Sequence, residues 1–164
     1  RWAQSSGYPA LAEEAKEAAQ HPEETEAEFN RLCIGPYRLI VVPYESAWVK
    51  GSRKLNGPVA EDVANFYAAA GLSSASLLNE LPDFFGNELE FLYFLDALFD
   101  EVRGKGNQEQ LLKDIQGLSD AFRAEHFDKW FEPFLDAIAE NTSQDFWKEA
   151  SAALKAELRR TQAV

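Results

Sequence analysis

Cysteine and histidine, which often serve as nucleophile, base or metal ligand, are rare in this chain of 164 residues. Cys33 is the only cysteine, and His21 and His126 are the only histidines. A nucleophilic cysteine needs a base such as histidine beside it, and nothing in the sequence places either histidine next to Cys33. A lone cysteine between Leu32 and Ile34 is more often a packing residue than a catalytic one.

The sequence also lacks the usual motifs for binding a metal ion or a phosphate group. Neither histidine belongs to a His-Glu-x-x-His or Glu-x-x-His pattern, which is unfavourable for a zinc or di-iron site. The stretch 51–54 lacks the second, spaced glycine of a phosphate-binding loop. Glu88 and Glu90 are two residues apart, so on a helix they do not share a face and make a weak acid–base pair. We therefore expect no metal, no cofactor and no enzyme activity.

The net charge, the length of the apolar runs and the cysteine count limit the kinds of partner that we expect. The formal net charge is −12, which repels phosphate backbones and anionic membrane surfaces and favours a basic partner. We expect no nucleic-acid binding. No apolar run approaches the roughly 20 residues of a membrane-spanning helix, so we expect no stable membrane insertion. A single cysteine allows no internal disulfide, which predicts a soluble protein of a reducing compartment, the cytoplasm.

The excess of acids is concentrated in two blocks. Residues 1–28 carry a net charge of −5 and residues 79–101 a net charge of −7, while the rest of the chain is balanced. Charge runs are usually solvated helix faces. The alternative is that the second block flanks a cationic ligand. Charge alone favours the solvated faces.

Helix signals dominate the chain. Pro9, Pro22 and Pro58 can each occupy the first position of a helix, where the missing N–H costs nothing. We expect the second and third of these helices to end at Gly35 and Gly71. The stretch 84–103 is so densely apolar that we expect a central helix buried on most of its sides and ended at Gly104.

Further helices are expected in the last third of the chain. Asn107 with Gln110, and Thr142 with Asp145, have the spacing of capping boxes, which predicts helix starts at both places. A helix between them is expected to begin at His126. These elements predict an all-α fold, a single-domain helical bundle over residues 1–164.

One connection, about residues 35–57, interrupts the helices. Its apolar run 39–42 predicts an extended segment, because a lone strand finds no sheet partner in this chain. It also carries the large aromatic residues Tyr37, Tyr44 and Trp48. Long connections of this kind are usually functional or disordered, and the aromatic and apolar residues argue against disorder. These side chains either grip a peptide or cover the end of the bundle core, and the sequence leaves both readings open.

Four blocks of the chain resemble, in order, the signatures of the TorD/DmsD/NarJ chaperone family. The blocks are residues 28–36, 43–48 (Pro-Tyr-Glu-Ser-Ala-Trp), 81–91 and 125–130. This resemblance implies an all-helical cytoplasmic chaperone that holds the N-terminal leader, often twin-arginine, of a molybdenum or tungsten oxidoreductase subunit. It implies two partners, that leader and the catalytic subunit of a molybdopterin oxidoreductase. The alternative is a helical scaffold or regulatory subunit that binds a folded partner without recognising a leader.

The resemblance also assigns candidate residues. The family's leader contacts, transferred to this sequence, fall on Phe29, Leu32, Cys33, Tyr37, Gly57, Asp83 and Phe84. By this resemblance we expect the family's first helix to be absent or shortened before Tyr8, as in a fragment or in a homodimer formed by domain swapping. Two positions depart from the family pattern, because Cys33 stands where the family has Phe and Phe84 where it has His. These departures imply an altered leader preference.

The residues themselves suggest how a leader would be bound. Acids can pair with arginines and aromatic side chains can pack an apolar stretch. We expect Asp83 and Glu88 to pair with cations, although Asp83 has the alternative role of N-cap for a helix beginning at Phe84. Glu45 has the alternative role of acceptor for loop backbone amides. The full predicted leader site also includes Tyr44, Glu45, Ser46 and Trp48.

Overall fold

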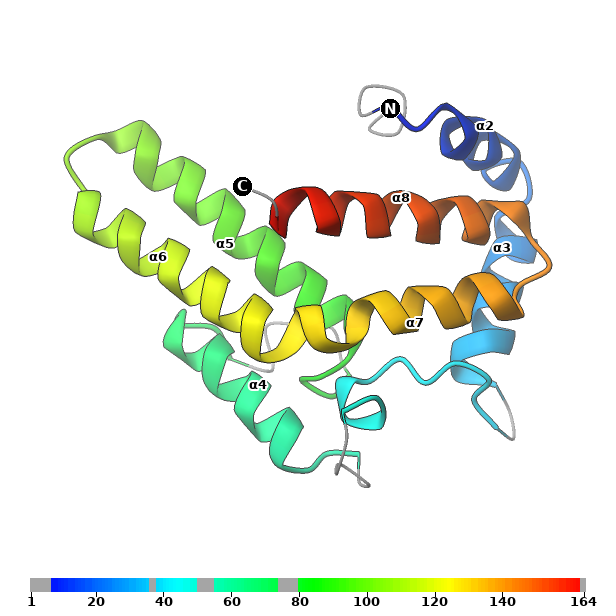
Figure 1. Ribbon diagram of the computed structural model, residues 1–164, viewed down its shortest axis with the longest axis horizontal. Coiled ribbons are helices and arrows are strands. Elements are labelled where there is room, and N and C mark those ends of the chain that lie inside the picture. Colours follow the sequence, from blue (N-terminus) through cyan, green and yellow to red (C-terminus); the bar gives the residue numbers. More distant parts are fainter. Residues whose placement is uncertain (1–6, 36–37, 50–54, 74–79, 163–164) are drawn as a thin grey trace. The chain divides into compact units, whose positions relative to one another are not determined.

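The computed structural model describes residues 7–35, 38–49, 55–73 and 80–162. Throughout these ranges the regular elements are helices, and the β contact is an isolated bridge between Tyr44 and Phe84. The all-α prediction is confirmed. The helices (Figure 1) are α2 (Pro9–Ala18), α3 (Pro22–Phe29), α4 (Pro58–Ala69), α5 (Phe85–Lys105), α6 (Glu109–Phe122), α7 (Asp128–Asn141) and α8 (Asp145–Gln162), with the π turns η1 (Asn30–Ile34) and η4 (Arg123–Phe127) and the 3-10 turn η2 (Glu45–Ala47).

The helix starts at proline are confirmed. Pro9, Pro22 and Pro58 are the first residues of α2, α3 and α4. Proline has a backbone φ already suited to a helix, and its absent N–H would have had no partner in the first turn. Helix α4 ends before Gly71, whose φ of +78° lies in the left-handed region that glycine adopts at little cost.

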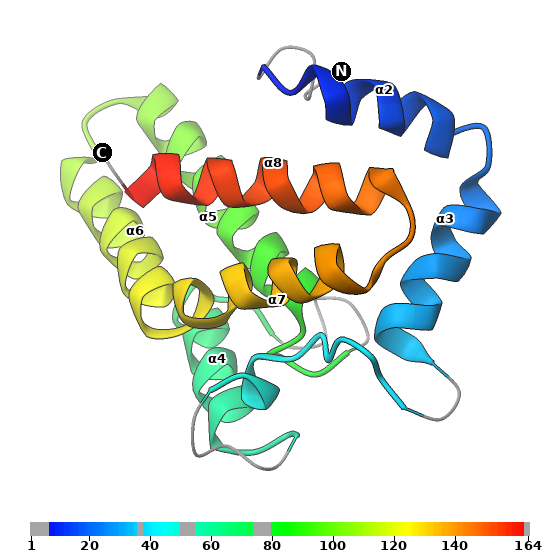
Figure 2. The same cartoon turned by 45° about the vertical axis from the view of Figure 1, so that its right-hand side comes forward.

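The chain forms two compact units. The terminal unit consists of residues 1–42 and 132–164, and the central unit of residues 43–131. The prediction of a single domain over residues 1–164 stays a prediction. In the terminal unit, α2 packs against α8 and α3 (Figure 2) around a small core of Leu11, Ala12 and Ala153.

The central unit has an aromatic core. Helices α5 and α6 lie side by side (Figure 1), and α4 packs against α6. The rings of Tyr67, Phe91 and Phe122 are fully buried, and the Phe91 centroid lies 4.8 Å from each of the other two. Each such ring removes a large apolar area from water, so this cluster stabilises the unit.

Helix α5 differs from its prediction in two respects. It buries one face, with Phe91, Leu92 and Leu95 inside, whereas Tyr93 is 74% exposed. The helix also continues past Gly104 to Lys105. The end falls at Gly106 because this glycine has the left-handed φ, +66°, that terminates a helix.

The two predicted capping boxes are wrong in detail. Helix α6 begins at Glu109, and no side-chain hydrogen bond caps its N-terminus. The Thr142 hydroxyl accepts a hydrogen bond from the backbone N–H of Gln144, one residue before α8 begins. The predicted helix start at His126 is also wrong, because the chain is already helical there, in the π turn η4.

The irregular connection is confirmed for the part of it that the structure describes. Between residues 38 and 49 and between 55 and 57, the regular element is the short turn η2. The prediction of an extended segment over 39–42 is wrong in part, because this run of the terminal unit bends at Ile40 and Val41, where it is tied to η1. The backbone N–H groups of Ile40 and Val41 both donate to the carbonyl of Leu32, at 3.0 and 2.9 Å.

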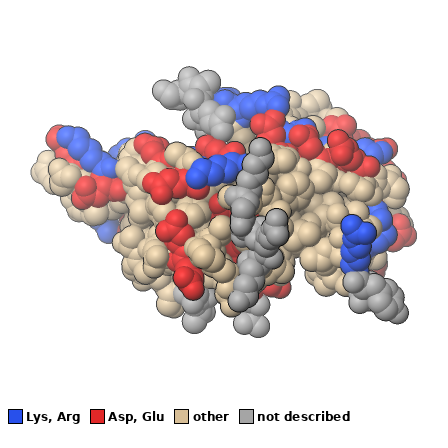
Figure 3. Space-filling view, turned by 60° about the horizontal axis from the view of Figure 1, so that its bottom comes forward, with Lys and Arg blue, Asp and Glu red and all other residues tan. Residues whose placement is uncertain are grey.

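The acids of the second block, residues 79–101, do not all lie on one solvated face. Acidic and basic side chains are interspersed on the face in Figure 3. Of the block's carboxylates, those of Asp83 and Glu88 have no exposed surface, while Glu90 and Asp96 are exposed. Among the described residues, no helix combines the length and the apolar character needed to cross a membrane.

Candidate functional site

Two signature blocks are joined by backbone hydrogen bonds in the central unit. The N–H of Glu45 donates to the carbonyl of Asp83 at 2.9 Å, and the N–H of Phe85 donates to the carbonyl of Pro43 at 3.0 Å. The Asp83 carboxylate accepts a third bond, 3.0 Å long, from the N–H of Ser46. Asp83 therefore holds the irregular connection against the start of α5. Its predicted role as an N-cap is wrong, because no side chain caps α5.

The fourth block, residues 125–130, contacts the second block through His126. Nδ1 of His126, in η4, lies 2.8 Å from Oε2 of Glu45, and both side chains are buried. On the other side of the ring, Nε2 lies 3.4 Å from a carboxylate oxygen of Asp62 in α4. The Glu45 carboxylate therefore contacts His126, whereas the sequence suggested a bond to loop amides. The contact joins η2 to the π turn between α6 and α7.

Glu88, like Asp83, is a fully buried acid of the central unit. The indole N–H of Trp130 donates to its Oε2 at 3.0 Å, and neither side chain is exposed. Burial, and then the nearby carboxylate of Glu45, raise the pKa of Glu88 well above its ordinary value. A carboxyl in this environment holds its proton, because the charged form has lost its hydration.

These side chains form a buried polar cluster with unused acceptors. Its members are Glu45, Ser46, Asp83, Asn87, Glu88 and His126. Within the described part of the chain, four of its oxygens find no hydrogen-bond partner: Ser46 Oγ, Asp83 Oδ1, Asn87 Oδ1 and Glu88 Oε1. Unused buried acceptors are costly unless a donor reaches them. No group of three or more His, Cys, Asp or Glu side chains in the described ranges has the arrangement to hold a metal ion.

Three aromatic residues that are close in sequence to members of the buried polar cluster are partly exposed at the surface. The rings of Tyr44 and Phe84 lie 5.7 Å apart and are half-buried, as is Trp48. The Tyr44 hydroxyl donates to the exposed Glu80 at 2.9 Å. Burial, followed by this bond to Glu80, raises the pKa of Tyr44 to about 12. We call Tyr44, Trp48 and Phe84 the aromatic surface.

The first signature block lies in the terminal unit and begins with a structural acid. The Glu28 carboxylate accepts two hydrogen bonds from Arg31, at 2.7 and 2.9 Å, one from the Thr142 hydroxyl at 2.8 Å and one from the Ser143 N–H at 3.1 Å. These donors, Arg31 foremost, lower the pKa of Glu28 to about 2. The carboxylate therefore ties the end of α3 to the loop between α7 and α8.

The next residues of this block are in the interior. Leu32 and Cys33 are 1% and 2% exposed. Burial raises the pKa of the Cys33 thiol to about 12, so the thiol is protonated at neutral pH and is a poor nucleophile. This agrees with the packing role expected from the sequence.

Phe29 is the accessible aromatic residue of the first block. Its ring stacks on that of Trp147 at a centroid distance of 5.6 Å. Both rings line a shallow apolar groove of about 520 Å³, whose other lining residues include Ala15, Ala18 and Phe146. The small alanine side chains of α2 leave this groove open beside the two large rings.

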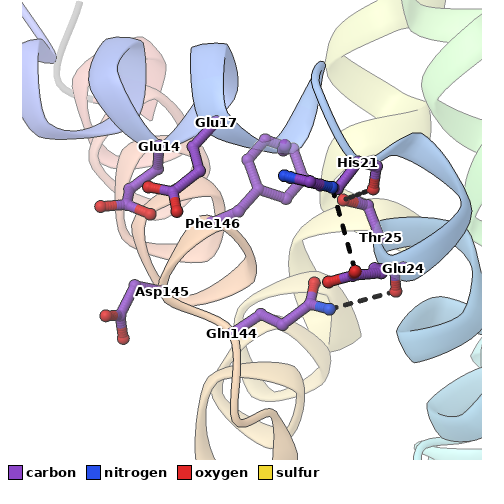
Figure 4. A pocket seen from close by; sticks show the side chains of 9 residues that line it. Glu14, Glu17, His21, Glu24, Thr25, Gln144, Asp145 and Phe146 are labelled. Atoms are coloured by element: carbon purple, nitrogen blue, oxygen red, sulfur yellow. Dashed lines mark hydrogen bonds and ion pairs between the residues drawn. The ribbon is translucent and has the colours of Figure 1, made fainter.

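An acidic pocket adjoins the groove. It has a volume of about 290 Å³ and shares Ala18, Thr25 and Phe146 with the groove. Figure 4 shows the carboxylates of Glu14 and Glu17 extending from α2, with Asp145 across from them and Glu24 on α3. We call the groove and the pocket together the composite groove of the terminal unit.

The predicted leader residues thus fall into three groups. Tyr37 lies outside the described residues. The buried group consists of Leu32, Cys33, Glu45, Ser46, Gly57, Asp83 and Glu88, and the half-buried group of Phe29, Tyr44, Trp48 and Phe84. Their role in leader binding stays a prediction.

Sequence reasoning missed several partners of these residues. The sequence gives Glu28 and Trp130 no role beyond their place in signature blocks, and it offers His126 only as a base, a metal ligand or a helix start. The buried bonds of all three depend on contacts far along the chain. A signal existed for the acidic pocket, because Glu14, Glu17 and His21 are spaced to share one face of a helix.

Comparison with known proteins identifies a family. The family model described as nitrate reductase delta subunit matches residues 3–136. Searches of curated proteins and of solved structures found no match. The members of the matched family mature redox enzymes and are not catalysts, in line with the expectation that this chain is not an enzyme. Since the match covers most of its residues, the chain belongs to the nitrate reductase delta subunit family, the chaperones that mature nitrate-reductase-type molybdoenzymes.

Proposed function

We propose that this chain binds the N-terminal leader of a molybdenum or tungsten oxidoreductase subunit in the cytoplasm. It holds the leader, of the twin-arginine type, until the cofactor is inserted, and releases it for export or membrane assembly. The family supplies the general role of maturation chaperone. Binding of a leader goes beyond this general role.

The aromatic surface carries this proposal. Tyr44 and Phe84 come from two different signature blocks, and their half-buried rings lie 5.7 Å apart. Aromatic side chains contribute large contact areas at a low cost in conformational entropy, which suits them to gripping an apolar peptide segment. The family's His is replaced by Phe84 here, and this widens the apolar area of the surface.

The buried acids receive a supporting role in this proposal. Asp83 holds Ser46 and the connection, and Glu88 is buried against Trp130. A fully buried carboxyl does not meet a guanidinium at the surface. We therefore assign Asp83, Glu88 and Glu45 to positioning Tyr44 and Phe84, and the contact with cations to exposed acids.

Titration of the full chain with synthetic leader peptides, followed by calorimetry, tests the proposal. We expect saturable micromolar binding, weakened about tenfold by Tyr44→Leu, because a hot-spot aromatic contributes on the order of 1–2 kcal/mol. Tyr93→Leu is the matched control, since Tyr93 is an exposed aromatic residue of α5 in the same unit. If well-folded protein binds no leader but co-purifies with a folded oxidoreductase subunit, the scaffold alternative replaces this proposal.

A further inference from the structure

We infer that the composite groove of the terminal unit receives the arginine-bearing start of the leader together with the apolar residues that follow it. This inference rests on the proposed function and adds to it the place and the chemistry of cation recognition. The occupant is a peptide in which two guanidinium groups precede an apolar stretch.

The acidic pocket has carboxylates that are available for cations. No ion pair or hydrogen bond involves the side chains of Glu14 or Glu17 within the described part of the chain. The other charged groups facing them are partly matched. Asp145 pairs with Lys148 at 2.8 Å, and Nδ1 of His21 lies 3.9 Å from Glu24. The pocket is therefore net negative before a ligand arrives.

Guanidinium groups suit this pocket better than isolated ammonium groups. Glu14 and Glu17 are one helical turn apart on α2, so their carboxylates face the same side (Figure 4). Arginine presents five N–H donors in a planar fork and can reach two carboxylates at once. Lysine offers a single compact charge in the same space.

The position of the apolar groove beside the acidic pocket determines that the cations and the apolar residues of the peptide must be close together in its sequence. Phe146 and Ala18 line both the pocket and the groove, so a chain that leaves the acids meets the stacked rings of Phe29 and Trp147 within a few residues. A peptide with the reverse order, or with its cations far from its apolar residues, does not match both parts. Charge complementarity and this continuity together identify the occupant.

Trp147 lines the groove, so its fluorescence can report the binding of a peptide. Wild-type protein is titrated with a leader peptide that has two arginines before an apolar stretch, and with the same peptide in which citrulline replaces both arginines. Citrulline keeps the shape and removes the charge. We expect about tenfold weaker binding of the citrulline peptide and a change in tryptophan fluorescence that Trp147→Phe largely removes.

Matched variants locate the site. Glu14→Gln with Glu17→Gln is expected to weaken binding about threefold to tenfold at low salt, since exposed pairs contribute on the order of 0.2–1 kcal/mol each. The control, Glu23→Gln with Glu140→Gln, makes the same change in net charge at exposed acids outside the pocket. Ala18→Arg is expected to weaken binding at least about tenfold, and Ala156→Arg, at an exposed position of α8, to leave it unchanged.

The outcomes separate the two proposals. If wild-type protein binds no leader, the proposed function fails. If it binds, but Ala18→Arg and the pocket variant bind as the wild type does, the composite groove is not the site and the proposed function stands. If Ala18→Arg instead changes the oligomeric state without changing peptide affinity, a second copy of the chain occupies the groove, and the inference is overturned.

Discussion

The indole N–H of Trp130 donates to the carboxyl of Glu88 at 3.0 Å, in a place where neither side chain has any exposed surface. The two residues are 42 positions apart and belong to different signature blocks. Burial with one donor and one unused oxygen raises the pKa of this carboxyl well above its ordinary value and favours the protonated form, since ionisation would leave a charge without hydration.

Glu88→Gln is expected to stabilise the protein at neutral pH. The raised pKa means that the folded state holds a proton that the unfolded state releases above its ordinary pKa of 4.5. Stability therefore falls as pH rises above about 4.5, and glutamine removes this loss while still accepting the Trp130 bond. Thermal unfolding of both proteins between pH 4 and pH 8 measures the effect. A wild-type advantage that grows with pH would contradict it.

Glu28→Gln is expected to destabilise the protein at pH 7 by up to about 3 kcal/mol, because the pKa of Glu28 is about 2 when folded and 4.5 ordinarily, and each unit of that difference corresponds to about 1.4 kcal/mol. The stabilisation is complete above about pH 4.5 and is lost as pH falls toward 2. Urea unfolding at pH 7 and pH 3 tests this. Glu23→Gln, an exposed acid of the same helix, should show little change at either pH.

Asp83→Ala is expected to lower the free energy of unfolding by about 1–3 kcal/mol, because it leaves the buried N–H of Ser46 without its acceptor. Asp83→Asn keeps an acceptor oxygen and should recover most of this loss. Chemical unfolding of the two variants measures the difference. Equal losses would show that the charge of Asp83, and not its bond to Ser46, stabilises the fold.

The Cys33 thiol is expected to react with a soluble thiol reagent at least about a hundredfold more slowly in the folded protein than in denaturant, since it is 2% exposed and burial raises its pKa to about 12. The neighbouring position provides the control. Ile34 is 60% exposed, so in Cys33→Ala with Ile34→Cys the thiol should react nearly as fast as a free one. Rapid labelling of the wild type would disprove the packing role.

Local features of the chain were predictable because they depend on neighbouring residues alone. Pro9, Pro22 and Pro58 begin helices as expected, since the pyrrolidine ring sets φ and removes a donor wherever it stands. The all-α class follows from the same local signals. The signature blocks likewise pointed to the family before any geometry was known.

The two π turns were not predictable. η1 spans Asn30–Ile34 and η4 spans Arg123–Phe127, each inside or beside a signature block. The wider turn of η1 places both Leu32 and Cys33 in the interior, and that of η4 does the same for His126 and Phe127. Such a turn has weaker internal hydrogen bonding and is retained only where packing compensates, which no local pattern reveals.

The candidate site likewise combines features that the sequence predicted with features that depend on tertiary contacts. The sequence by itself determined the all-α class, the helix starts at proline and the family, because these follow from residue types and their local order. Only the tertiary structure decided which carboxyl groups are buried. Asp83 and Glu88 belong to an acidic run of the kind that is usually solvated, yet both are buried and accept hydrogen bonds from Ser46 and Trp130. In contrast, Glu14 and Glu17 line an open pocket. Desolvation depends on groups that are distant in sequence, and those meet only in the folded chain.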